Sequence, residues 1–190
     1  MNTLTRRLLL SAFLLGGLAA CDKPASPPEI AGPAFKTTAT VQDLMVSIVD
    51  PAADGVWEAV GTELSKDGLV EKQPRTDEEW LAVRKQAITL VESANLLLIP
   101  GRAVVAAGGK VEDAHVPGIL SGDESQQAIR KDQAGFAGEA NRFHDVAELA
   151  LKAIDAKSVA GLLEAGSRIQ QACESCHVKF WYPNAKKPPA

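Results

Sequence analysis

The sequence predicts an all-α protein built as an antiparallel four-helix bundle. Three observations predict it: apolar residues recur every three or four positions in four segments, alternating strand-like patterns are scarce, and Ala, Leu, Glu, Lys and Gln are abundant. Of the 190 residues, 46% are hydrophobic and 23% are charged, which suits one globular domain rather than a disordered chain. Four amphipathic segments of this length bury their apolar stripes when they pack around one core.

Residues 1–20 are expected to be a secretory signal peptide. Arg6 and Arg7 precede an apolar run, Leu8 to Leu15, that is too short for a stable membrane span. The run ends in Leu-Ala-Ala-Cys, which resembles the bacterial lipobox, so Cys21 is predicted to carry lipid. An ordinary cleavage site with an incidental cysteine is the alternative. Four prolines make residues 21–38 a semi-rigid tether, which precedes the folded domain at 39–183 and a tail at 184–190.

The first helical pattern begins at Thr40, which forms a capping box with Asp43, and its apolar residues recur as far as Val60. Pro51 lies inside this pattern and lacks a backbone donor, so we expect it to kink or divide the helix. The second helix is expected to begin at Thr76, where Glu79 completes a capping box, and to stop before Pro100-Gly101.

A third helix is expected from about Asp123 to Ala156, and its first half contains two glycines that weaken it. A fourth is expected from Ser158 until Pro183 ends it. Between the second and third helices, Pro100 to Ser121 forms a connection of unusual length. Such connections are either mobile or functional, and the sequence leaves both interpretations open.

The charge balance excludes one class of partner. Twenty Lys and Arg residues stand against 24 Asp and Glu residues, which gives a net charge of −4, and no basic block lies outside the extreme termini. A surface that binds nucleic acid needs clustered basic residues. We therefore expect no nucleic-acid partner.

The motif C-x-x-C-H at Cys173, Cys176 and His177 carries the chemistry. Two thiols three residues apart can bond to the two vinyl groups of one haem, while the adjacent imidazole reaches the iron, so this spacing is typical of covalent haem c attachment. A zinc site would need a fourth ligand that the sequence does not offer nearby. A dithiol redox site would need its first cysteine at a helix N-terminus, whereas both cysteines lie near a predicted C-terminus.

A C-x-x-C-H motif near the C-terminus of a predicted four-helix bundle resembles the class II c-type cytochromes, the cytochrome c′ family. The sequence has Phe180 where members carry an aromatic residue and Trp181 where many carry a basic one. The resemblance implies one covalent haem inside the bundle, His177 as the fifth iron ligand, and a side chain of the first helix facing the sixth position. It also implies that dimers form through the first two helices, so a homodimer is an alternative to a monomer.

Met45 is the candidate sixth ligand, because it lies on the apolar stripe of the first helix and no other methionine remains after cleavage. The alternative is that it only packs in the core. His144 and His115 are weaker candidates, on the third helix and in the long connection.

These observations predict a lipid-anchored, monohaem electron carrier on the periplasmic side of a bacterial membrane. It would act with redox partner proteins in the periplasm or membrane rather than as an enzyme. In the resembling family, members without a sixth methionine ligand bind nitric oxide or carbon monoxide, so a five-coordinate gas-binding protein is the alternative. A structural lipoprotein without haem is a third interpretation.

Overall fold

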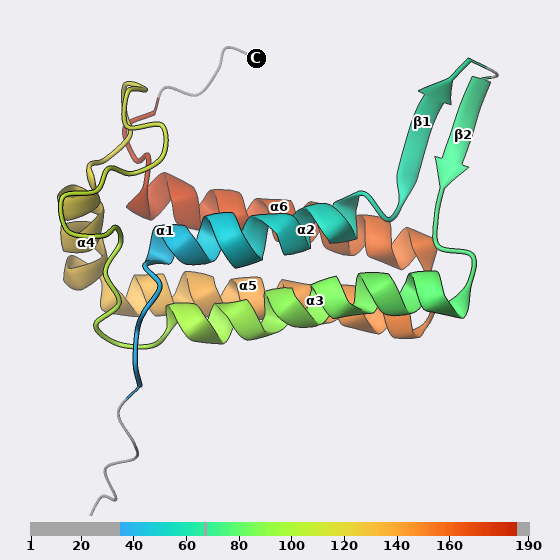
Figure 1. Cartoon of the computed structure of the whole chain (residues 1–190), viewed down its shortest axis with the longest axis horizontal. Helices are drawn as coiled ribbons and strands as arrows, with labels where there is room; N and C mark the ends of the chain where they lie inside the picture. The colour runs from blue at the N-terminus through green and yellow to red at the C-terminus, as the bar shows by residue number, and fades with distance from the viewer. Residues whose placement is uncertain (1–34, 67, 186–190) are drawn as a thin grey trace, which may run out of the picture. The chain divides into compact units, whose positions relative to one another are not determined.

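The computed structural model describes residues 35–66 and 68–185, and this part of the chain is mostly helical (Figure 1). The elements are α1 (Val41–Leu44), a π-helical segment η1 (Met45–Val49), α2 (Asp50–Trp57), β1 (Gly61–Ser65), β2 (Gly68–Lys72), α3 (Asp77–Leu97), α4 (Gly122–Lys131), α5 (Gln133–Asp155) and α6 (Val159–Phe180). The prediction of a mostly helical protein is confirmed, and the described residues also contain one two-stranded sheet. The predicted signal peptide, Cys21 and most of the tether lie outside the described residues.

Four long helical stretches, α1–η1–α2, α3, α5 and α6, run beside one another, and successive stretches point in opposite directions (Figure 1). α5 packs against α3 and α6, and α2 packs against the same two helices. Leu90, Leu162 and Ile169 are fully buried between them. Small residues such as Ala87 and Ala147 are also fully buried, and their size lets neighbouring helices approach closely.

The first helical stretch is interrupted near Pro51 by a π-helical segment, where the sequence predicted a kink or a division. Thr40 caps it as predicted, since its hydroxyl accepts the Asp43 N–H at 3.0 Å while the Asp43 carboxylate accepts the Thr40 N–H at 2.9 Å. The helix then widens to a π-helical turn in which the Asp50 N–H donates to the Met45 carbonyl. Pro51 has no N–H and its ring crowds the preceding turn, so a wider turn accommodates it without a break.

The second and fourth predicted helices are confirmed. Thr76 and Glu79 form the capping box at the start of α3, with hydrogen bonds of 3.2 and 3.1 Å. Ser158 caps α6 by accepting the Gly161 N–H at 3.1 Å.

The predicted third helix, Asp123 to Ala156, is wrong as a single element. It is divided into α4 and α5 at Asp132, whose φ of −132° and ψ of 63° are not helical. The Asp132 carboxylate accepts the Gly135 N–H at 2.9 Å and so caps the new helix. α4 packs against α5 and α6 rather than extending the line of α5.

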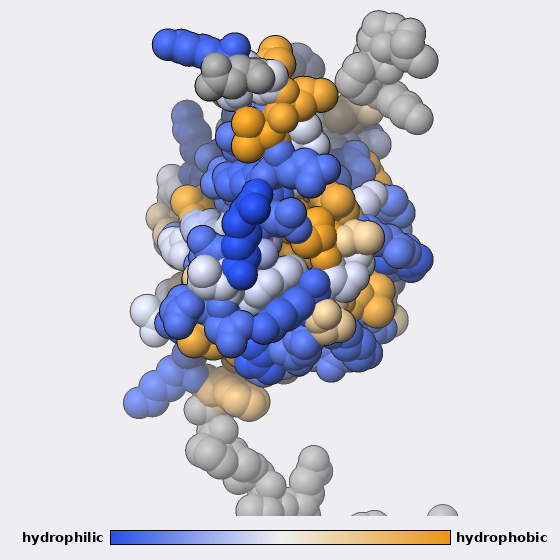
Figure 2. All heavy atoms as spheres, turned by 90° about the vertical axis from the view of Figure 1, so that its right-hand side faces the viewer, coloured by the Kyte–Doolittle hydropathy of each residue, from blue (hydrophilic) through white to orange (hydrophobic). Residues whose placement is uncertain are grey.

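A β-hairpin that the sequence did not predict joins α2 to α3. Its strands are antiparallel, with Leu64 opposite Leu69, and these two side chains are 83% and 76% exposed. Figure 2 looks onto this end of the described part, where hydrophobic side chains gather among hydrophilic ones. Because both faces of the hairpin meet water, its sequence lacks the inside-outside alternation by which strands are recognised.

The long connection between α3 and α4 folds back onto the start of the first helical stretch. The Val41 N–H donates to the Ala103 carbonyl at 2.8 Å, and the Gln42 N–H donates to the Val104 carbonyl at 3.0 Å. None of the helices that the structure describes is long and apolar enough to cross a membrane.

Candidate haem site

The C-x-x-C-H motif lies in the last turns of α6, where Cys173 and Cys176 are neighbours on one side of the helix and are partly buried free thiols. Burial raises the pKa of Cys173 to about 11, and the Asp50 carboxylate adds to this shift. Burial, followed by the Glu139 carboxylate and Cys173, raises the pKa of Cys176 to about 12. Both thiols are therefore protonated at neutral pH, whereas a dithiol redox enzyme lowers the pKa of its attacking thiol.

Two aromatic residues that follow α6 hold the ring of His177. Trp181 contacts it edge-on with the ring centres 5.0 Å apart, and Tyr182 lies 5.9 Å away. The Tyr182 hydroxyl donates to the Glu174 carboxylate at 2.6 Å, which keeps Tyr182 in place. Burial lowers the pKa of His177, so its imidazole is neutral at pH 7 and one ring nitrogen carries a free lone pair.

Two adjoining hollows of about 120 and 240 Å³ lie against the motif and form what we call the thiol cavity. Together they reach the lower end of the size range of small-molecule sites, roughly 300 to 1,000 Å³. Most of the lining is apolar, and it comes from all the helices that the structure describes and from the long connection. Six residues line both hollows: Met45, Asp50, Leu97, Phe136, Cys176 and His177.

The structure places Met45 in the wall of the thiol cavity together with Cys176 and His177. Met45 is half-buried and also packs against the apolar core, so packing and ligation are both compatible with its position. His144 lies elsewhere on α5, with its Nδ1 3.6 Å from the Asp145 carboxylate. His115 is exposed in the long connection, and neither histidine is among the residues that line the thiol cavity.

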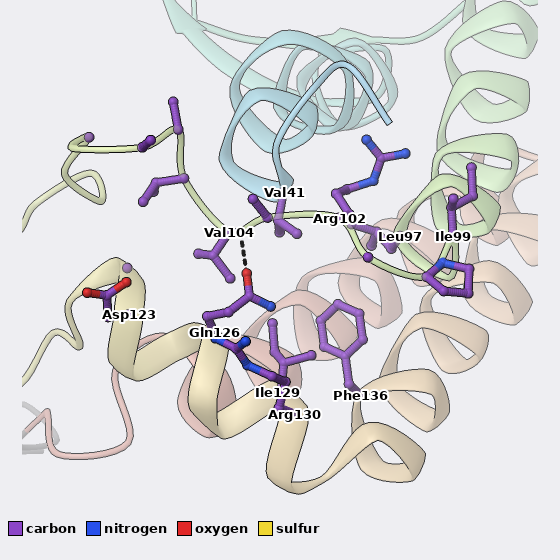
Figure 3. A pocket seen from close by; sticks show the side chains of 18 of the residues that line it. Val41, Leu97, Ile99, Arg102, Val104, Asp123, Gln126, Ile129, Arg130 and Phe136 are labelled. Carbon is purple, nitrogen blue, oxygen red and sulfur yellow. Dashed lines mark hydrogen bonds between the residues drawn. The ribbon is translucent and has the colours of Figure 1, made fainter. Parts of the chain in front are cut away.

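The long connection covers one end of the thiol cavity. The Gln42 side chain donates to the Lys110 carbonyl at 3.2 Å and accepts the Glu112 N–H at 2.7 Å, which ties the connection to α1. The Val104 N–H donates to the Gln126 side chain of α4 at 2.9 Å (Figure 3). The connection thereby encloses a larger neighbouring hollow, which shares Val41, Leu97, Val104, Ile129 and Phe136 with the thiol cavity (Figure 3).

Glu139 joins α5 to the motif from inside the protein. Its side chain is 3% exposed and pairs with Lys179, while Arg142 Nε lies 3.7 Å from its Oε2 atom. Burial alone would raise the pKa of Glu139, but the hydrogen bonds from Lys179 and Ser175 outweigh burial and lower it. The ionised carboxylate therefore fixes the turn of α6 that carries the thiols, a contact that no pattern in the sequence indicates.

Ser125 is another residue of the cavity wall that the sequence did not reveal as part of the site. It lies on α4, is 3% exposed, and its hydroxyl has no hydrogen-bond partner within the described residues. A serine in an amphipathic helix usually faces water, so only the packing of α4 reveals its position.

No protein-family model, no curated protein and no solved structure matches this chain. Within the described ranges, no group of three or more His, Cys, Asp and Glu side chains could by itself hold a metal ion. Any function must therefore be argued from the site itself.

Proposed function

We propose that this protein is a monohaem c-type cytochrome with a four-helix-bundle domain, exported and lipid-anchored through Cys21, which transfers single electrons on the periplasmic side of a bacterial membrane. One observation carries the proposal. The C-x-x-C-H motif lines a largely apolar cavity to whose wall Met45, from another helical stretch, also contributes.

The donor groups of the thiol cavity fit the chemistry of a haem. Each protonated thiol, Cys173 and Cys176, would add across one vinyl double bond, forming a carbon–sulfur bond while the thiol proton passes to the neighbouring vinyl carbon. The neutral ring of His177, held by Trp181 and Tyr182, would offer its lone pair to the iron. The bound haem would supply the one-electron chemistry of its iron, and the protein would supply ligation and a dry environment.

Met45 would complete the site by holding the iron through its thioether. A thioether ligand favours ferrous iron and raises the reduction potential. An iron with two protein ligands changes its coordination little between oxidation states, which suits an electron carrier. The partners would be redox proteins in the periplasm or the membrane.

A second candidate is a five-coordinate haemoprotein that binds nitric oxide or carbon monoxide. It is favoured by the packing of Met45 against the apolar core, which gives this side chain a structural role without ligation. In that case the cavity beside Met45 would receive the gas.

Expression of the full chain in a bacterium that matures c-type cytochromes tests the proposal. We expect one haem per chain in the pyridine haemochrome assay and a haem-stained band in denaturing electrophoresis that survives acid-acetone extraction. The double variant Cys173→Ala/Cys176→Ala should lose the stained band. An unmutated chain without haem, or with haem that acid-acetone removes, would contradict the proposal and favour a structural lipoprotein.

The anchor is tested with Cys21→Ser in the same host. This variant should leave the membrane fraction while keeping its haem, because the predicted tether lies before the first helix. Membrane association that resists washing in the variant would place the anchor elsewhere.

A further inference from the structure

Ser125 is a buried hydroxyl without a partner. Ser93, the other buried serine among the described residues, differs in its hydrogen bonding, since its hydroxyl donates to the Leu90 carbonyl of its own helix at 2.8 Å. The Ser125 hydroxyl makes no such bond. A buried hydroxyl that donates to nothing costs free energy, so an orphan of this kind points to a group that binds there.

The position of Ser125 relative to the motif is set by hydrogen bonds and packing at the start of α4. The Leu120 N–H donates to the Trp181 carbonyl at 2.8 Å, which joins the beginning of α4 to the end of α6. A methyl group at Gly122 would lie 2.3 Å from Val105 Cγ2, so α4 is packed directly onto the long connection. Ser125 therefore lines the same hollow as Cys176 and His177.

The chemistry of the hollow indicates what Ser125 would bind. Its hydroxyl lies in the first turns of α4, where the positive end of the helix dipole favours a negative group. The carboxylates of Asp123 and Glu124 belong to the same turn, but both residues are exposed and neither lines this hollow. Asp50 and Glu112 line another part of the same hollow, and their carboxylates would repel a further anion. An anionic oxygen in this hollow is therefore favoured beside α4.

We propose that Ser125 anchors the haem by donating a hydrogen bond from its hydroxyl to a haem carboxylate. The inference rests on the proposed function, because it assigns a residue to the group that the thiols would hold. It adds α4, an element outside the motif, to the haem site. Ser125 thereby decides how one edge of the haem is seated.

Resonance Raman spectroscopy of the haem-loaded full chain tests this assignment, because the bending band of the haem propionates responds to their hydrogen bonds. Ser125→Ala should shift this band. Ser93→Ala is the matched control, since it also removes a buried hydroxyl but lies on α3 away from the cavity, and it should leave the band in place. A haem-loaded chain whose band is unchanged in Ser125→Ala would overturn the assignment and leave the proposed function standing.

A binding measurement provides the second readout. In the Cys173→Ala/Cys176→Ala background, the full chain is titrated with haem and with haem dimethyl ester, whose carboxylates are blocked. Ser125→Ala should weaken haem binding roughly tenfold or more and leave ester binding within about twofold. Equal losses for both ligands would mean that Ser125 only shapes the cavity, which overturns the inference. An unmutated chain that acquires no haem at all would instead refute the proposed function.

Discussion

Replacement of Met45 by Leu distinguishes the proposed electron-transfer function from the alternative gas-binding function. Met and Leu have similar volumes, and exchanges of this kind usually cost less than about 1.5 kcal/mol. Since Met45 is half-buried and packs at the edge of the core, we expect Met45→Leu to stay folded with a loss in this range. Loss of the thioether should nevertheless convert a low-spin haem to a high-spin one, lower the reduction potential and allow carbon monoxide to bind.

Three measurements on haem-loaded protein decide the result: ferric and ferrous absorption spectra, a carbon monoxide titration, and denaturant unfolding. Leu44→Met is the matched control, because it makes the reverse exchange at the neighbouring buried position and keeps Met45. The control should remain low-spin. If the unmutated protein is already high-spin and binds carbon monoxide readily, Met45 is a packing residue and the gas-binding function is favoured.

Three further predictions concern the fold. Leu162→Ala should lower the free energy of unfolding in urea by about 2 to 5 kcal/mol, because this side chain is fully buried, and a loss below about 1 kcal/mol would contradict the described core. Gly122→Ala should lower the free energy of unfolding by about 1 to 3 kcal/mol, because the new methyl would lie 2.3 Å from Val105 Cγ2. In the control Gly138→Ala the new methyl contacts nothing, so this variant should be as stable as the unmutated protein or more stable. Equal effects of the two substitutions would refute this reasoning. The hydrogen-bonded ion pair with Lys157 lowers the pKa of Asp77, so the stabilisation from this pair is present above about pH 4 and is lost as the pH falls through the lowered pKa. Asp77→Asn should therefore lose less stability than the unmutated protein in thermal melts between about pH 5 and 2. Identical acid profiles would contradict the pairing.

Local signals in the sequence predicted much of the helical structure. The capping boxes at Thr40 and Thr76 and the cap at Ser158 mark the starts of the helical stretches correctly, because a cap satisfies backbone N–H groups with side chains two or three residues away. The spacing of Cys173, Cys176 and His177 likewise predicted the location of the candidate site. Such signals need only a few neighbouring residues, so they can be read directly from the chain.

Other local features, at Pro51 and Asp132, are visible in the sequence but do not by themselves determine how the helices run. Pro51 predicted an interruption, but whether the chain kinks, divides or widens depends on what packs around that turn, and here a π-helical turn keeps the stretch continuous. Asp132 and Gly135 form a cap that divides the third predicted helix, yet the apolar periodicity on both sides favoured one helix. Local preferences of this size are small beside the free energy of tertiary packing.

Only the tertiary structure decided which distant residues surround the motif. Ser125 and Glu139 are ordinary polar residues of amphipathic helices in the sequence, and both are buried beside the thiols because α4 and α5 pack against the end of α6. The long connection encloses the cavity through hydrogen bonds to Gln42 and Gln126, whose partners lie tens of residues away. Periodicity tells which face of a helix is buried, but which faces meet depends on contacts between segments that the chain brings together only when it folds.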